Sequence, residues 1–147
     1  MAASEQDRQQ IAAVVEQYRR GFVTGDIEGL KAIWDQDYDN IIYIAQEAAR
    51  PVRGWAGVEQ YYKHVDGLFE PARTMTVSDL SVDVFGDVAY AYCVFHFEGK
   101  FKGQSEPFLA DGRDTFILRR KSGTWKVIHY HESRPGPVAM TEEGETR

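Results

Sequence analysis

The stretch DTFILRRKSGTWKVIHYHES, residues 114–133, decides the fold class of this 147-residue chain. Residues 114–119 and 125–133 are rich in β-branched and aromatic side chains, which is typical of strands. Residues 121–124, KSGT, have the composition of a tight turn. The stretch therefore predicts two antiparallel strands joined as a hairpin.

Two further strands are predicted ahead of this hairpin. Apolar residues alternate with a period of two over residues 75–84, and the phase of the alternation slips near Ser78–Asp79. Such a slip indicates a β-bulge, which bends a sheet. Residues 88–97 are almost continuously apolar, so we expect a strand that is covered on both faces. The C-terminal half thus predicts four long antiparallel strands.

The N-terminal half predicts three helices around one short strand. Residues 4–24 place apolar side chains on one helical stripe, with a polar cap at the start and a glycine after the end. Asp26 caps a short second helix, residues 40–45 form a strand, and residues 55–69 form a third helix after a loop. Helices gathered on one face of a bent antiparallel sheet make an α+β architecture, with a conical cavity suited to a small molecule.

The composition limits the partners that this chain can have. With 43% hydrophobic and 27% charged residues, it can form one packed domain over residues 1–134, followed by a partly disordered tail at 135–147. The net charge of −6 argues against nucleic acid and anionic membranes. A single cysteine, Cys93, excludes a disulfide framework within the chain. Without a signal peptide or an apolar run of about 20 residues, we expect a cytoplasmic protein with no membrane segment.

Four groups of short motifs carry a family resemblance. They are VVEQY at 14–18 followed by Gly25-Asp26, GWAGV at 54–58 ahead of Tyr61-Tyr62, GRDTF at 112–116, and GTW at 123–125 running into IHYHES at 128–133. Together they resemble the nuclear transport factor 2-like superfamily, which includes SnoaL-like polyketide cyclases and ketosteroid isomerases. The last group is similar to the SnoaL-like subgroup related to the association domain of calcium/calmodulin-dependent kinase II. The resemblance implies a cystatin-like α+β fold, a cone-shaped barrel of three N-terminal helices packed on a bent antiparallel sheet.

The resemblance also implies two hydrogen-bond donors to an oxyanion. In ketosteroid isomerases, a tyrosine at the position of Tyr18 and a protonated aspartate at the position of Asp114 donate to the developing negative charge. An apolar pocket raises the pKa of such a carboxyl group and keeps it neutral. The alternatives are a core tyrosine at Tyr18, and an ion pair of Asp114 with Arg113 or Arg119.

The general base of those isomerases, an aspartate in the loop after the first strand, has no direct counterpart. The equivalent residues 44–48 contain only Glu47, displaced in register, which disfavours steroid isomerisation. His96 and Glu132 stand where the kinase association domain has pocket-facing arginines, and they offer a substitute acid/base pair. A structural ion pair at the floor of the cavity is the alternative.

Alternation along the last strand supports this position of Glu132. It places Ile128, Tyr130 and Glu132 on one face, and Trp125, Val127, His129 and His131 on the other. Two histidines on one strand face can hold a metal if a third ligand is present, but none is visible. The resemblance places this face outward, against a partner sheet. We therefore expect packing or a homodimer interface at the two histidines, and no metal site.

Six aromatic side chains are candidate walls of the cavity: Trp34, Trp55, Tyr62, Tyr92, Phe116 and Tyr130. Collectively they favour a flat hydrophobic ligand, although aromatic side chains also fill ordinary cores. Phe116 replaces a further arginine of the association domain, so recognition of small carboxylates is not expected. The chain has no phosphate loop, dinucleotide fingerprint or serine-nucleophile motif, and we expect no cofactor.

These patterns predict a SnoaL-like protein that encloses a small hydrophobic molecule bearing a carbonyl group. As an enzyme it would be a cofactor-free isomerase, cyclase or dehydratase. Tyr18 and Asp114 would then stabilise an oxyanion, while His96 and Glu132 move protons. The alternative is a non-catalytic domain that binds a small molecule or forms homo-oligomers, as the kinase association domain does.

Overall fold

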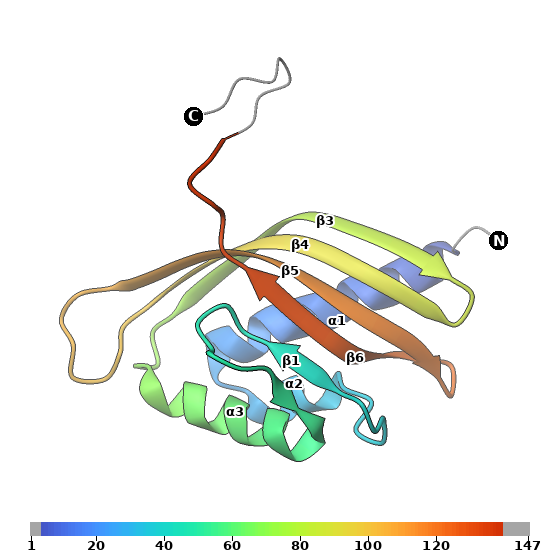
Figure 1. The fold of residues 1–147 in the computed structure, drawn as a ribbon, viewed down its shortest axis with the longest axis horizontal. Coiled ribbons are helices and arrows are strands. Elements are labelled where there is room, and N and C mark those ends of the chain that lie inside the picture. The colour runs from blue at the N-terminus through green and yellow to red at the C-terminus, as the bar shows by residue number, and fades with distance from the viewer. Residues whose placement is uncertain (1–3, 140–147) are drawn as a thin grey trace.

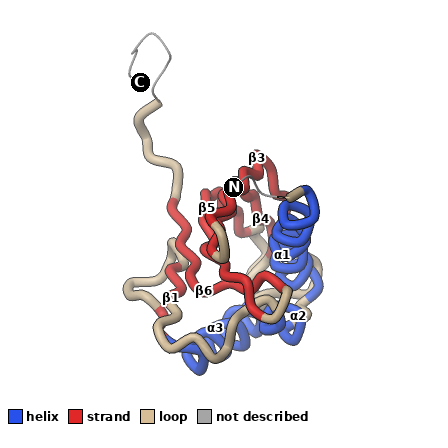
Figure 2. Tube along the Cα trace, turned by 90° about the vertical axis from the view of Figure 1, so that its right-hand side faces the viewer, coloured by secondary structure: helices blue, strands red, loops and turns tan. Residues whose placement is uncertain are grey.

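The computed structural model describes residues 4–139, which form three helices and six strands (Figure 1). In chain order the elements are α1 (Glu5–Thr24), α2 (Ile27–Ala32), β1 (Ile42–Ile44), β2 (Val52–Arg53), α3 (Gly54–Leu68), β3 (Thr74–Phe85), β4 (Val88–Gly99), β5 (Phe108–Lys121) and β6 (Thr124–Ser133). The helices lie on one side of the bent sheet (Figure 2), which confirms the predicted α+β class. Of the predicted tail, residues 135–139 contain no helix or strand, and residues 140–147 lie outside the described residues.

The sheet has the strand order β2-β1-β6-β5-β4-β3. All neighbouring strands are antiparallel except β1 and β6, which run parallel. Within residues 4–139, β2 and β3 are the two edges and do not pair with each other. The sheet is therefore open, and the predicted cone-shaped barrel is not formed. The edge formed by β1 and β2 is short, with three and two residues in these strands.

Local sequence sets the ends of the first two helices as predicted. Ser4 Oγ accepts a hydrogen bond of 3.0 Å from the Asp7 N–H at the start of α1. Gly25 ends the helix with a left-handed φ of 69°, a conformation that costs glycine little. Asp26 then caps α2, because its Oδ1 accepts from the Gly29 N–H at 3.0 Å.

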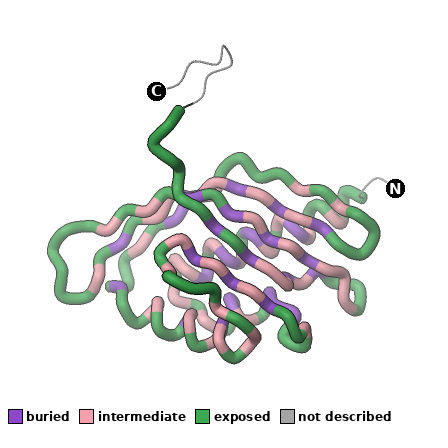
Figure 3. The backbone as a smooth tube through the Cα atoms, viewed as in Figure 1, coloured by how far each residue is buried: buried purple, intermediate pink, exposed green. Residues whose placement is uncertain are grey.

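A bulge in β3 bends the sheet at the predicted place. The pairing of β3 with β4 shifts between Ser78 and Ser81, and Asp79 adopts a φ of 55°. The neighbouring strand β4 alternates buried with partly exposed residues along most of its length (Figure 3). The prediction that this strand is covered on both faces is therefore wrong for the described chain. Its inner face packs towards the helices, and its outer face stays partly exposed.

A second bulge, in β6, makes part of the predicted assignment of side chains to the two faces of that strand wrong. The pairing of β6 with β5 skips Ile128. One extra residue switches the alternation of side chains between the two faces. Trp125 and Val127 are therefore buried on the same inner face as Tyr130 and Glu132, against the predicted parity. The sequence pattern did not reveal this bulge.

Two segments predicted as loops contain strands. The loop predicted ahead of the helix at residues 55–69 includes β2, and β5 begins at Phe108, six residues before the strand predicted from Asp114. Phe108 lies beside Phe101, with ring centroids 4.9 Å apart, and Phe101 stacks on Phe69 at the end of α3 with a centroid distance of 4.6 Å. These contacts between distant segments hold the long β4–β5 hairpin, so local sequence alone does not define it.

A buried ion pair ties the end of α2 to the β5–β6 hairpin. Asp35 is 1% exposed, and its two carboxyl oxygens accept from Arg119 Nε and Lys121 Nζ at 2.6 Å each. The Asp35 N–H also donates to the Val127 carbonyl at 3.0 Å. Burial raises the pKa of Asp35, but the hydrogen bonds from Lys121 and Arg119 outweigh it, so the pKa is lowered. This carboxylate is charged and fully paired.

The core fills the space between the helices and the inner face of the sheet. Its largest fully buried side chains are aromatic and include Tyr43, Tyr62, Phe116 and Tyr130. Buried positions recur along β4, β5 and β6 at alternate residues (Figure 3). Among the described helices, none combines the length and the apolar character needed to cross a membrane.

Candidate functional site

Two carboxyl groups lie side by side in the core. Asp114 on β5 pairs in register with Glu132 on β6, so the two residues are direct cross-strand neighbours. Both face the helices, with Asp114 2% and Glu132 9% exposed. Burying two carboxyl groups costs free energy unless they are protonated or paired with cations. No Lys, Arg or His forms an ion pair with either group among residues 4–139.

The phenol of Tyr130 connects the two carboxyl groups. Its hydroxyl lies 2.9 Å from Asp114 Oδ2 and 3.3 Å from Glu132 Oε2. The other oxygen of Asp114, Oδ1, accepts from Cys93 Sγ at 2.7 Å. Tyr130 and Glu132 are two residues apart on β6 and therefore share its inner face. The strand itself brings the phenol and the carboxyl group together.

Three more phenols complete what we call the inner cluster, which consists of Asp114, Glu132, Tyr18, Tyr43, Tyr62 and Tyr130. The hydroxyls of Tyr18 and Tyr43 lie 2.6 Å apart, and the ring of Tyr43 stacks on Tyr130 with a centroid distance of 4.6 Å. Tyr62 accepts a hydrogen bond of 2.8 Å from Trp34 Nε1. The cluster therefore draws on α1, β1, α3, β5 and β6. Its polar atoms sit among aromatic rings in mutual contact.

Burial dominates the electrostatics of the inner cluster. It raises the pKa of Asp114, although hydrogen bonds from Cys93 and Tyr130 oppose the shift. Burial, with the nearby charges of Glu47 and Asp114, raises the pKa of Glu132 to about 8. Burial also raises the pKa of the Tyr18, Tyr43 and Tyr130 phenols well above the usual value of 10.0. The phenols therefore remain donors, and Glu132 exchanges its proton near neutral pH.

The inner cluster approaches the surface at Glu132, its most exposed member. The loop after β1 lies beside it, and there Glu47 accepts a hydrogen bond of 2.6 Å from the Tyr61 hydroxyl. Gln46 Oε1 in the same loop is buried and accepts no hydrogen bond from the described residues. Gly112 lies opposite, where an added Cβ would come within 2.4 Å of the Phe95 ring and 3.0 Å of Gln46 Oε1. We call this group of four residues, Gln46, Glu47, Gly112 and Glu132, the mouth of the inner cluster.

The structure brings several predicted site residues together. Tyr18 and Asp114 both adjoin Tyr130, since the rings of Tyr18 and Tyr130 have centroids 5.1 Å apart. The proposed alternative for Asp114, a pair with Arg113 or Arg119, is not formed, because Arg113 donates to the Arg134 carbonyl and Arg119 to Asp35. The predicted walls Trp34, Tyr62, Phe116 and Tyr130 are buried, and Trp55 packs at the edge of the core. Aromatic rings occupy the centre of the predicted conical cavity.

Two predicted site residues lie on the other face of the sheet. His96 is partly exposed there, and its Nδ1 pairs with Asp111 Oδ1 at 2.6 Å. The expected pair of His96 with Glu132 is therefore not formed. The reason is strand parity, because Cys93 faces inward and a residue three positions later faces outward. Tyr92, a predicted wall, faces outward for the same reason.

Sequence reasoning missed Tyr43 and Cys93 as members of this region. Tyr43 lies in the middle of a short β-branched strand, and strict alternation places it opposite its neighbours Ile42 and Ile44. That signal could have shown that Tyr43 is buried. It could not have shown that its hydroxyl meets Tyr18, because this contact depends on how α1 packs over the sheet.

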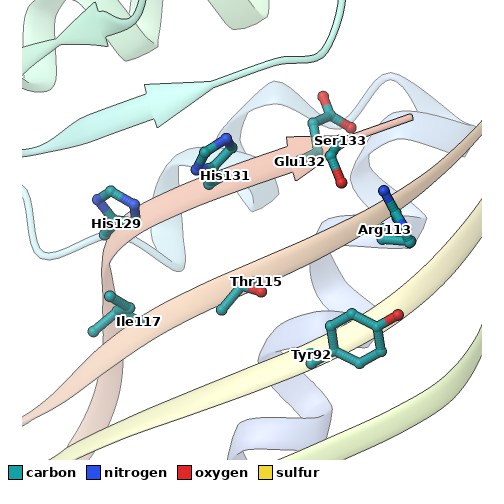
Figure 4. A pocket seen from close by; sticks show the side chains of 8 residues that line it. All are labelled: Tyr92, Arg113, Thr115, Ile117, His129, His131, Glu132 and Ser133. Carbon is teal, nitrogen blue, oxygen red and sulfur yellow. The ribbon is translucent and has the colours of Figure 1, made fainter. Parts of the chain in front are cut away.

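The outer face of the sheet carries a shallow depression of about 440 Å³. Its lining residues are Tyr92, Arg113, Thr115, Ile117, His129, His131, Glu132 and Ser133, on β4, β5 and β6 (Figure 4). Partial burial and the neighbouring imidazole of His131 lower the pKa of His129. The described residues contain no group of three or more metal-ligating side chains that could hold an ion.

An open, mainly antiparallel sheet with three helices on one face, and with acids and phenols buried between them, makes this protein an α+β domain. The sequence model of the SnoaL-like domain matches residues 11–137. The chain therefore belongs to the SnoaL-like family, as its motifs predict. No curated protein sequence matches it.

Solved structures share the fold at low sequence identity. A candidate dehydratase of the NTF2-like family from Streptomyces avermitilis superposes with a TM-score of 0.80 at 18% identity, covering 90% of this chain and 99% of that one. A ketosteroid isomerase-like protein from Erwinia carotovora atroseptica gives 0.74 at 18% identity, covering 91% and 100%. A candidate calcium/calmodulin-dependent protein kinase II association domain from Xanthomonas campestris gives 0.73 at 17%, covering 93% and 95%. At such identities the likeness concerns the fold alone.

Proposed function

We propose that this protein is a cofactor-independent enzyme that moves a proton within, or eliminates water from, a small uncharged carbonyl compound. The observation that carries this proposal is the pair of buried carboxyl groups, Asp114 and Glu132, held beside phenols without a cation. Removal of a proton next to a carbonyl group requires a base near the carbon and donors near the oxygen. The inner cluster contains groups of both kinds.

Each chemical role has a candidate group. Glu132, with a pKa of about 8, takes or returns the proton at the mouth of the cluster. Phenols that stay protonated donate to the oxygen as its negative charge develops, and Tyr18 and Tyr43, whose hydroxyls lie 2.6 Å apart, are one pair of such donors. The orphan acceptor Gln46 Oε1 suits a hydroxyl group of the substrate, which favours elimination of water from a hydroxy-carbonyl compound.

The test is a turnover assay with small cyclic enones and β-hydroxy ketones as probes. Asp114→Asn and Glu132→Gln keep the shape of each side chain and remove the titrating group. We expect each to lower turnover about 10²–10⁴-fold. Asp111→Asn, an exposed carboxyl group on the same strand β5, is the matched control and should leave turnover unchanged. Equal activity of all three variants would contradict the proposal.

A second candidate function is assembly through the outer face of the sheet. The observation behind it is the depression on that face, where partly buried Tyr92, Ile117 and His129 lie together. Native mass spectrometry of the protein tests this candidate. An acidic side chain at Ile117 should weaken a homodimer formed there, whereas Phe85→Asp, at the exposed end of β3, should not. A dimer without turnover of any probe favours this second function.

A further inference from the structure

The bridging phenol of Tyr130 restricts how protons are distributed between the two buried acids. Its hydroxyl is 2.9 Å from Asp114 Oδ2 and 3.3 Å from Glu132 Oε2. A phenol has a single proton and can donate it to one of these oxygens only. If both carboxyl groups were ionised, the phenol proton would serve one of them, and the Tyr130 oxygen would face a negatively charged oxygen of the other without a proton between them. A proton on one acid, donated to the Tyr130 oxygen, removes this repulsion.

The contacts indicate which acid holds that proton. Asp114 has a donor at each oxygen, Tyr130 at Oδ2 and Cys93 at Oδ1, so its hydrogen bonds are complete as a carboxylate. Glu132 has the Gln46 backbone N–H as a donor, but it lies at the longer distance from Tyr130 and close to the carboxyl group of Glu47, whose charge disfavours a second negative charge. Glu132 is therefore the protonated acid of the pair, and its raised pKa agrees with this assignment.

Among residues 4–139, the groups around the two acids include no cation that could balance two negative charges. Those that act on the pKa of Asp114, Glu132 or their phenols come from every surrounding element. They are Tyr18 on α1, Tyr43 on β1, Glu47 in the following loop, Tyr61 and Tyr62 on α3, and Cys93 on β4. These side chains are acids, phenols or a thiol, and the Gln46 backbone N–H, which also acts on Glu132 and lowers its pKa, carries no charge. The nearest bases along the two strands, Arg113 and His131, line the outer depression, which Glu132 also borders, and neither of them is among the groups that shift the pKa of Glu132.

We propose that Asp114, Tyr130 and Glu132 form a proton chain in which the two acids share a single carboxyl proton. In the resting state Glu132 donates to the Tyr130 oxygen, and Tyr130 donates to the Asp114 carboxylate. When the phenol proton moves to Asp114 and the Glu132 proton moves to the phenol oxygen, the three groups keep one negative charge in total. The charge has then passed to Glu132, which becomes a base at the mouth without exchanging a proton with solvent.

This proton chain deepens the proposed function, and its catalytic role rests on that function. It supplies the base that the loop after β1 does not provide at the family's position. Glu132 is the group that meets the substrate, and Tyr130 and Asp114 are positioning residues that act through it. The resting arrangement can nevertheless be tested in the isolated protein, without any substrate.

Isotope-edited infrared spectroscopy of the wild-type protein tests the resting arrangement. We expect one carbonyl band of a protonated carboxylic acid at neutral pH. The band should shift when glutamate is ¹³C-labelled at its side-chain carboxyl, and stay in place when aspartate is labelled. It should disappear as the pH rises through about 8. No such band, or a band that follows the aspartate label, would overturn the proposal, and neither result requires a variant to fold.

A matched pair of tyrosine variants tests the bridge. Tyr130→Phe removes the acceptor of the Glu132 proton, so the carbonyl band should move to higher frequency and its pH midpoint should change. Tyr90→Phe removes an exposed phenol-to-carboxylate hydrogen bond, that of Tyr90 to Asp83 at 2.7 Å, and should leave the band unchanged. An unshifted band in folded Tyr130→Phe would show that the phenol does not bridge the acids.

The two proposals fail in different ways. A glutamate band with the expected pH dependence, but no turnover of any probe, keeps the proton chain and rejects the enzymatic function. Turnover that depends on Glu132, with no protonated acid at neutral pH, keeps the function and rejects the chain. Under the chain, Tyr130→Phe should also alter the pH profile of turnover, which a purely structural role of the phenol would not do.

Discussion

Two buried acidic regions of this molecule have opposite electrostatics. Asp35 and Asp114 are both nearly inaccessible, at 1% and 2% exposed. Asp35 accepts from Arg119 and Lys121, and its pKa is lowered. Asp114 and its neighbour Glu132 form no ion pair with a cation among residues 4–139, and burial raises the pKa of both. Both regions involve the same β5–β6 hairpin.

The difference separates a structural role from a chemical one. A buried carboxylate between two cations is fixed in its charged form and connects α2 to the hairpin. A buried carboxyl group without a cation changes protonation at accessible pH, which is a property that proton-transfer sites require. Burial of an acid alone therefore does not identify a site, and the charge of its partners does. Four measurements test this contrast, in order of decreasing expected effect.

The largest effect should be the pH dependence of stability. The pKa of Glu132 is about 8 in the folded protein, above its usual value of 4.5, so the folded state binds more protons between these values. Stability from this group is therefore greatest below about pH 4.5 and falls as the pH rises to about 8, by up to about 5 kcal/mol. Urea unfolding across this range measures the fall. Glu132→Gln should flatten the profile, and an unchanged slope in this variant would assign the effect to another group.

The next effect should come from Asp35→Asn. The amide leaves two cations without their counter-charge, and we expect a loss of about 2–3 kcal/mol of unfolding free energy, reduced because Arg119 and Lys121 are more than a third exposed. Asp37→Asn is the matched control. It removes an exposed carboxylate that contacts the same Lys121 at 2.8 Å, and it should cost less than about 0.5 kcal/mol. Equal losses in the two variants would remove the contrast.

A smaller effect of opposite sign is expected for Asp114→Asn. Replacing a buried carboxyl group that has no cation by its neutral isostere should leave stability unchanged or raise it by about 1 kcal/mol near neutral pH. Thermal unfolding of this variant beside Asp35→Asn compares the two regions directly. A loss for Asp114→Asn as large as that for Asp35→Asn would mean that Asp114 is structural.

The smallest effect should follow His96→Ala. The imidazole pairs with Asp111 on the outer face, and this exposed pair contributes little, so stability should stay close to that of the wild-type protein. Because His96 lies on the other face of the sheet from the inner cluster, turnover of any probe should be unaffected. A large loss of turnover would restore the acid/base role that the sequence predicts for His96.

The residues that local rules govern were predictable. The Ser4 and Asp26 caps, the glycine stop at Gly25 and the bulge at Ser78–Asp79 follow from spacing and turn chemistry, and the structure contains each of them. The burial of Tyr18 on the helical stripe belongs to the same group. These features depend on neighbours within a few residues, which is the range over which sequence patterns carry information.

The misplaced residues depend on contacts between distant segments. The skipped Ile128 in β6 reverses the parity of Trp125 and Val127, and a bulge of this kind is set by the pairing with β5. Strand parity could have placed His96 on the outer face of the sheet. The residues around it are nearly all apolar, however, so the sequence does not show which face of the strand is buried. The β4–β5 hairpin beyond Gly99 forms because its phenylalanines contact Phe69, which follows the end of α3.

The sequence by itself determined the α+β class, the family and the identity of the acids to examine. Periodicity, caps and motifs are local properties of the chain, and they suffice for that. Only the tertiary structure decided that the sheet is open, that Asp35 is neutralised while Asp114 and Glu132 are not, and that Tyr130 joins these two acids. The physical reason is that the pKa of a buried acid depends on burial and on partners that the fold brings from β4, β6 and the loop after β1.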